Sequence, residues 1–172
     1  MADAYGGISL STSKDSEINA ALLVELLNHY TWTNSGGEWT KHETNGKDIF
    51  WHRDNFGTQY PSLFPCECVA VLIKEGDETI RRIPAEQATE EDYDQCWDME
   101  EEDISLEALS NHFSKAITNG WFEIACTANE KNRYVYFQSL RIYAGGKAVR
   151  KSIFSGCCIE ELIDDVEIFN PN

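Results

Sequence analysis

The fold is decided by the stretch from residue 121 to residue 154, which reads WFEIACTANEKNRYVYFQSLRIYAGGKAVRKSIF. Residues 122–127 alternate apolar side chains with polar or small ones, the pattern of a strand with one buried face. Residues 134–143 form a long run rich in β-formers, and the Gly-rich turn at residues 144–147 leads into residues 148–154. We therefore predict three consecutive antiparallel strands, a meander, in the second half of the chain.

The remaining elements are placed by turn signals and helix periodicity. We expect strands at residues 7–11, 38–42, 48–53, 68–73 and 79–83. The strands at 38–42 and 48–53 are joined by Asn45-Gly46, a strong hairpin signal. A first helix is predicted after a cap at Asp15 or Ser16, with an apolar stripe of Ile18, Leu22, Leu23, Leu26 and Leu27. Thr89 marks a further helix start, and Ser105 caps a helix carrying Leu106, Leu109, Phe113 and Ile117.

The segregation of strands and helices favours an α+β fold. We predict an antiparallel sheet of about six to eight strands in hairpins and a meander, with two main helices packed on one face. The spacing of Ile159, Leu162, Ile163 and Val166 predicts a short C-terminal helix. Residues 1–172 are expected to form a single domain, in which residues 84–104 are an acidic connector.

Charge is distributed unevenly along this chain of net charge −16. Residues 86–107 contain eleven acidic residues and no Lys or Arg, and residues 160–167 contain five more acids and no base. Residues 131–151 contain six bases and no acid. Two interpretations stay open: the acidic blocks keep the protein soluble or pair with the basic meander, or they form a surface for a basic partner.

The binding hypothesis places the interaction on the acidic connector. A dense field of carboxylates attracts a cationic protein surface and repels nucleic acid, and an apolar side chain among the acids supplies an anchor. The candidate binding residues are Glu90, Glu91, Asp92, Asp94, Trp97, Asp98, Glu100, Glu101, Glu102 and Asp103.

A second candidate site is the mixed motif after the first hairpin, formed by Trp51, His52, Arg53, Asp54 and Tyr60. One interpretation is a hairpin end at which His52 and Arg53 point outward beside a buried Trp51. The other is a recognition loop of aromatic and polar groups, extended by Phe64.

Metal and nucleophile chemistry receive little support from the six cysteines. Cys66, Cys68, Cys157 and Cys158 offer four thiols, yet their spacing differs from that of common zinc motifs, so we predict no metal site and no cofactor. Cys126 fits the buried face of its strand. No Gly-rich phosphate loop, His-Glu-x-x-His or Gly-x-Ser-x-Gly motif occurs.

These patterns favour a non-enzymatic binding protein that docks on or blocks a basic surface of another protein. Suitable partners are a nuclease, a defence complex or a toxin, and the setting would be a phage, a mobile element or a toxin–immunity pair. Nucleic-acid mimicry would be one means of inhibition. The alternatives are a small enzyme or ligand-binding module built on the loop after Trp51, and a structural subunit, including a homodimer. A cytoplasmic location is expected, with neither direct nucleic-acid binding nor a membrane span.

Overall fold

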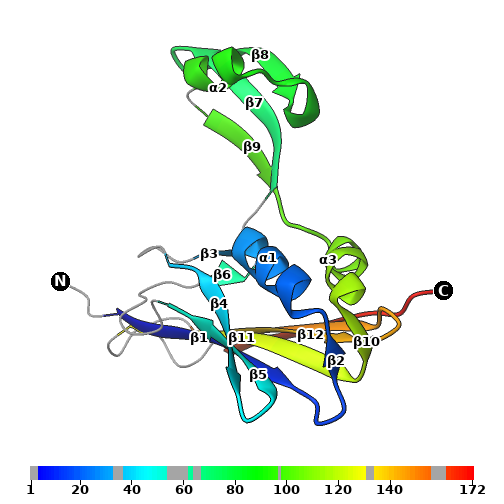
Figure 1. Cartoon of the computed structure of the whole chain (residues 1–172). Helices are drawn as coiled ribbons and strands as arrows, with labels where there is room; N and C mark the ends of the chain where they lie inside the picture. Colours follow the sequence, from blue (N-terminus) through cyan, green and yellow to red (C-terminus); the bar gives the residue numbers. More distant parts are fainter. Residues whose placement is uncertain are drawn as a thin grey trace. The chain divides into compact units, whose positions relative to one another are not determined.

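A computed structural model describes residues 4–32, 37–53, 62–63, 67–96, 98–130, 134–155 and 162–172. The architecture is sheet-rich and broadly α+β (Figure 1). The chain divides into two compact units: a large unit made of residues 1–64 and 105–172, and a small unit made of residues 65–104.

The large unit is built on a five-stranded antiparallel sheet in the order β1-β11-β12-β13-β14. Its strands are β1 (Ala4–Thr12), β11 (Trp121–Glu130), β12 (Tyr134–Tyr143), β13 (Ala148–Ser155) and β14 (Leu162–Phe169). The predicted meander is confirmed as β11, β12 and β13. Their register places apolar residues opposite one another on a single face, which forms the core. The buried residues on this face are Ile8, Phe122, Ile124, Cys126, Leu140, Ile142 and Ala148.

Two helices lie on one side of this sheet (Figure 1). Helix α1 (Ala20–Tyr30) buries Leu23, Leu27 and Tyr30, and its N-cap is Asn19, whose side chain accepts from the Leu22 amide. Helix α3 (Leu106–Phe113) begins at the predicted cap, Ser105. The Phe113 ring contacts Phe122 of the sheet at a centroid distance of 6.0 Å, so α3 covers the apolar face.

Short strand pairs complete the large unit. They are β2 (Glu17–Ile18) with β10 (Ile117–Asn119), β3 (Thr31–Trp32) with β6 (Ser62–Leu63), and β4 (Trp39–Thr44) with β5 (Lys47–His52). The 3-10 turn η2 (Ser114–Ala116) follows α3. The β4–β5 hairpin turns at Asn45-Gly46, as predicted, and both residues have the positive φ that such a turn requires.

The small unit is a three-stranded antiparallel sheet with one helix. Strand β7 (Glu67–Glu75) is central, flanked by β8 (Glu78–Pro84) and β9 (Asp98–Glu102). Between β8 and β9 lie the 3-10 turn η1 (Ala85–Gln87) and helix α2 (Glu90–Gln95). Ala70, Val71 and Ile83 are buried.

Several expectations about the fold need correction. The first helix is capped by Asn19 and not by Asp15 or Ser16, and Ile18 lies in β2 instead of the helix. The strands are divided among several sheets instead of forming one. The expected C-terminal helix is strand β14, because its backbone pairs with β13 over the full length from Leu162 to Phe169. Within residues 84–104, the expected acidic connector, the chain forms η1, α2 and β9, and β9 pairs with β7 in the sheet of the small unit.

Candidate functional site

The small unit carries most of the protein's net charge. Residues 65–104 contain fourteen acidic and three basic residues, which leaves −11 out of the total of −16. The other 132 residues contain sixteen acids and eleven bases, a net charge of −5. The charge asymmetry seen along the sequence therefore coincides with a structural unit.

All three bases of the small unit are already paired with carboxylates of the same unit. Lys74 Nζ lies 2.5 Å from Asp98 Oδ2, and Arg81 NH1 lies 3.6 Å from Asp92 Oδ1. Arg82 binds Glu100 through two hydrogen bonds, with Nε donating to Oε2 at 2.7 Å and NH2 donating to Oε1 at 3.1 Å. Residues 65–104 contain no base other than these three.

Hydrogen bonds and ion pairs favour the charged form of the three paired carboxyl groups. The Lys74 ammonium, by hydrogen bond and charge, and the Met99 amide lower the pKa of Asp98. The Arg82 guanidinium lowers the pKa of Glu100, chiefly through its hydrogen bonds. Hydrogen bonds from the backbone and side chain of Thr89 lower the pKa of Asp92, with a smaller contribution from Arg81.

The start of α2 is fixed by a capping box. The Thr89 hydroxyl accepts from the Asp92 amide at 3.3 Å, and the Thr89 amide donates to Asp92 Oδ2 at 2.9 Å. The first turn consists of Glu90, Glu91 and Asp92, which the positive end of the helix dipole favours. Thus the acidic residues that would bind a partner also define where this helix begins.

Most of the other acids of the small unit are solvent-exposed, and none of them lies within ion-pair distance of a base in the part of the chain that the structure describes. They are Glu75, Asp77, Glu78, Glu86, Glu90, Glu91, Asp94, Glu101 and Glu102. Of these, Glu91 accepts a hydrogen bond from Gln95. Asp103 is exposed as well. The side chains of all the acids proposed from the sequence thus belong to one folded unit.

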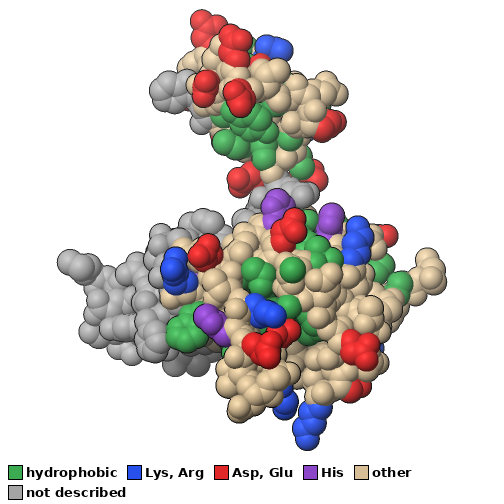
Figure 2. All heavy atoms as spheres, viewed as in Figure 1, with side chains coloured by type: hydrophobic (Ala, Val, Ile, Leu, Met, Phe, Trp, Pro, Cys, Tyr) green, Lys and Arg blue, Asp and Glu red, His purple; other side chains and the backbone are tan. Residues whose placement is uncertain are grey.

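Apolar side chains are exposed on the same unit. Ile80 of β8 is 58% exposed, Met99 of β9 is 46% exposed and Tyr93 of α2 is 39% exposed. Figure 2 shows hydrophobic side chains of the small unit with acidic side chains around them. Trp97, which the sequence suggested as an anchor, lies outside the described residues, whereas Met99 supplies an exposed apolar group on β9.

Sequence reasoning missed several exposed residues of the small unit. Glu75, Asp77 and Glu78 lie at the β7–β8 turn, outside the base-free block, because Lys74 and Arg81 interrupt the run of acids in sequence. Ile80 lies within the expected strand at residues 79–83, and its exposure depends on which face of the sheet it occupies. The Gly76-Asp77 pair between the expected strands at residues 68–73 and 79–83 was the available signal, because a tight turn there places both flanks of the hairpin in one unit.

The second candidate site differs from the expected arrangement. Trp51 is 50% exposed, whereas His52 is buried at 4%, so the expected buried Trp51 beside an outward His52 is wrong. The register of the hairpin explains this reversal, because His52 pairs with Trp39, whose side chain is buried. The two rings meet edge to face at 5.5 Å. Arg53 is exposed as expected, while Asp54, Tyr60 and Phe64 lie outside the described residues.

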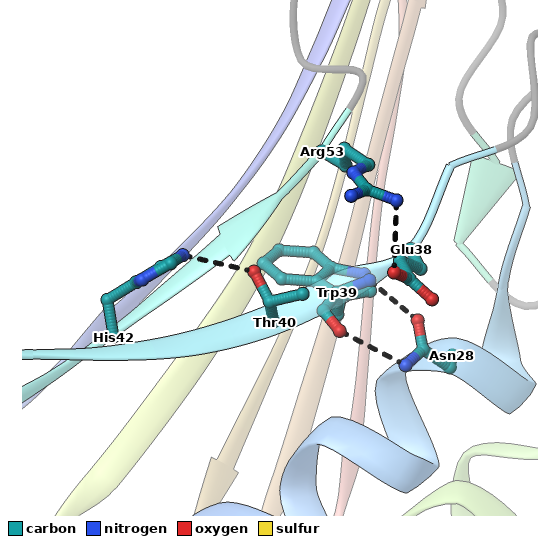
Figure 3. A network of polar contacts seen from close by, with 6 residues as sticks. All are labelled: Asn28, Glu38, Trp39, Thr40, His42 and Arg53. Carbon is teal, nitrogen blue, oxygen red and sulfur yellow. Dashed lines mark hydrogen bonds and ion pairs between the residues drawn. The ribbon is translucent and has the colours of Figure 1, made fainter.

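Hydrogen bonds anchor this hairpin to α1 (Figure 3). The Trp39 amide donates to Asn28 Oδ1 at 2.6 Å, and Asn28 Nδ2 donates back to the Trp39 carbonyl at 3.2 Å. Arg53 NH1 lies 3.4 Å from Glu38 Oε1, and the Arg53 amide donates to the Glu38 carbonyl. His52 and Arg53 therefore have a structural role, because they hold together the open end of the β4–β5 hairpin.

The cysteines that the structure describes are free thiols. Cys126 is buried on the core face, as predicted, and Cys68 and Cys96 are half-buried. Cys68 Sγ donates to the Ala70 carbonyl at 3.5 Å. Cys66, Cys157 and Cys158 lie outside the described residues. No cluster of three or more His, Cys, Asp or Glu side chains suited to a metal ion occurs among the residues that are described.

The C-terminal acidic block and the basic meander are in contact, because β14 pairs with β13. Arg150 of β13 donates to Glu167 of β14, with NH2 to Oε2 at 2.6 Å. Arg141 pairs with Glu123 and stacks on the Trp121 ring at 4.1 Å. The expected pairing of acidic with basic segments is therefore found at β14, where Glu167 pairs with Arg150. The paired acids of the small unit instead form ion pairs with bases of the same unit.

Within the described part of the chain, no helix is both long enough and apolar enough to cross a membrane. Comparisons with protein-family models, with curated proteins and with solved structures give no match to this chain.

Proposed function

We propose that this protein is a non-enzymatic binding protein whose small unit docks on a basic surface of another protein. The observation that supports the proposal is the charge of residues 65–104, a net −11 in which every base is already paired internally. Acidic residues that serve only to keep a protein soluble need not be concentrated in one folded unit. A docking module needs such a concentration, because its field must act from a defined surface.

Charge and apolar contact would play separate roles in such a complex. Exposed carboxylates raise the rate of encounter with a cationic surface, and this effect weakens as salt is added. Met99, Tyr93 and Ile80 would bury apolar area once the partner is reached, which slows dissociation. Screening by salt should therefore reduce the association rate more than the dissociation rate.

A protein that binds nucleic acid is the partner class that fits best. Its surface is basic because it must neutralise phosphates, and a folded array of carboxylates offers the same sign of charge. Occupying that surface would inhibit a nuclease or a defence complex, and a cationic toxin would be held in the same way. A cytoplasmic setting follows from this role as part of the proposal.

The test is capture of partners by the tagged protein at low and moderate salt, with a charge-matched control. The test variant carries Asp94→Asn, Glu101→Gln and Glu102→Gln, three exposed acids of the small unit outside the ion pairs. The control carries Glu25→Gln, Glu43→Gln and Glu107→Gln, three exposed acids of the large unit. Both variants lose three negative charges and keep the ion pairs described above.

We expect the wild type and the control to capture the same basic protein at low salt, and the test variant to lose it. Duplex DNA added to the wild-type complex should compete for a nucleic-acid-binding partner. Equal capture by the two variants would contradict the proposal, because the total charge alone would then explain binding.

A further inference from the structure

The large unit contains a polar cleft that is unrelated to the acidic surface. Its volume is about 420 Å³, within the range of pockets that hold small molecules. It lies where the end of β1 and the loop leading to β2 meet the tip of the β4–β5 hairpin. The lining residues are Thr12, Ser13, Lys14, Ser16, Ile18, Gly46, Lys47, Asp48 and Phe50.

The cleft presents positive charge in a protein that is strongly negative. Lys14 and Lys47 both line it, both are exposed, and neither forms an ion pair with any residue that the structure describes. Asp48 is the one carboxylate among the lining residues, and Lys41 neutralises it at 3.0 Å from outside the lining. Two ammonium groups therefore remain available for an anion.

Hydroxyl groups in the lining of the cleft add neutral donors. Ser13 is held in place because its amide donates to the Trp121 carbonyl at 2.9 Å and its Oγ accepts from the Trp121 amide at 3.0 Å. The hydroxyl hydrogen of Ser13 is still free to donate, since Oγ acts only as an acceptor in that bond. Ser16 and Thr12 bring two further hydroxyls to the same cleft.

Two apolar side chains also line the cleft. Ile18 and Phe50 are half-buried and line it together with the polar groups. A ligand that fits this arrangement has an anionic end with several acceptor oxygens and a small apolar body. A phosphate group suits the polar end, because its oxygens accept from ammonium and hydroxyl donors at the same time.

We propose that this cleft binds a small organic phosphate, with the phosphate between Lys14 and Lys47 and the organic part against Phe50 and Ile18. The site is independent of the docking surface, since all its residues belong to the large unit. It is distinct from the ligand-binding loop suggested by the sequence, because neither Trp51 nor His52 lines it.

The experiment is a titration of the full chain with phenyl phosphate, followed by the backbone amide signals in two-dimensional NMR. We expect saturable shifts at Lys14, Ser16 and Lys47, and weaker effects of inorganic phosphate at the same amides. In the Lys14→Gln, Lys47→Gln double variant, affinity for phenyl phosphate should fall about tenfold or more, because two charge-assisted contacts are removed.

Two controls make the result specific. Lys115→Gln removes an exposed lysine of the same unit that does not line the cleft, and it should leave the affinity unchanged. Benzyl alcohol has the ring without the phosphate and should shift these amides little. The proposal would be overturned by the absence of saturable shifts, by equal weakening in Lys115→Gln, or by benzyl alcohol binding as well as phenyl phosphate.

Discussion

Arg82 and Glu100 stand on the two edge strands of the small unit and meet across the central strand. Arg82 lies on β8 opposite Leu72, and Glu100 lies on β9 opposite Ala70, so the pair crosses β7 diagonally. Its two hydrogen bonds, at 2.7 and 3.1 Å, join strands that do not pair with each other. The pair therefore acts as a polar brace over a sheet with a small apolar core.

Loss of this brace should loosen both edge strands. We expect Glu100→Gln to speed hydrogen exchange of β8 and β9 amides at neutral pH, and Arg82→Gln to do the same. The double variant should exchange little faster than either single one, because both break one interaction. Glu101→Gln, which removes an exposed acid outside the ion pairs, is the matched control and should leave exchange unchanged or slower. Additive effects of the two single changes would contradict the brace.

The same pair predicts a pH dependence. The pKa of Glu100 lies below its ordinary value of 4.5, so the folded unit favours the ionised carboxylate. Its stabilising contribution is therefore present above pH 4.5 and is lost as the pH falls through the lowered pKa. The difference in exchange between wild type and Glu100→Gln should shrink below that pH. A difference that persists in acid would show that Glu100 acts through packing and not through charge.

Thr89 should control the stability of α2. Thr89→Ala removes the hydroxyl that accepts from the Asp92 amide, and such a loss of an N-cap costs about 1 kcal/mol. Thr89→Ser keeps the capping oxygen and should behave like the wild type. Amide exchange in residues 90–95 is the direct measurement, and equal exchange in the Ala and Ser variants would count against the cap.

Local signals in the sequence predicted the parts of the fold that local chemistry determines. The Ser105 cap, the Thr89 helix start and the Asn45-Gly46 turn depend on neighbouring residues and are confirmed. The apolar residues of β14 are spaced as on an amphipathic helix, so the sequence predicted a helix there. The same spacing is compatible with an edge strand, on which Val166 and Ile168 are exposed. Only the pairing with β13 decides between helix and strand, and local propensity does not report this tertiary contact.

The candidate sites show the same limit. The acidic block was visible as composition, but its boundary as a unit depended on the pairing of β9 with β7. Hydrophobicity favoured a buried Trp51, and the hairpin register buried His52 instead. No sequence motif indicated the proposed phosphate cleft. Lys14 and Lys47 lie 33 positions apart, and only folding brings both of them to its lining.

Trp39 joins the hairpin to the first helix through its ring nitrogen. Its indole Nε1–H donates to Thr31 Oγ1 at 2.8 Å, and Thr31 Oγ1 in turn donates to the Leu27 carbonyl at 2.6 Å. Trp39→Phe should destabilise the large unit by about 1–3 kcal/mol, because it removes a donor from a buried position and leaves space behind. Thermal or urea unfolding measures this change. In a Thr31→Val background the same substitution should cost less, and an equal cost in both backgrounds would exclude the hydrogen bond as the cause.

Gly120 is a position where backbone conformation and close packing coincide. Its φ is +76°, and a Cβ built there would lie 2.2 Å from Ser13 Oγ and 3.0 Å from Ser16 Cα. Gly145 has a similar φ of +88° but open space around it, so it is the matched control for strain without a clash.

Both Gly→Ala variants should be destabilised by the positive φ, and Gly120→Ala by at least about 1 kcal/mol more, because the backbone near Ser16 has to move. Urea unfolding of the two variants measures the difference. Since Ser13 and Ser16 line the phosphate cleft, Gly120→Ala should also weaken phenyl phosphate binding, whereas Gly145→Ala should not. Equal losses of stability in the two variants would mean that the loop after β1 adjusts freely and that the cleft is not held in place by this contact.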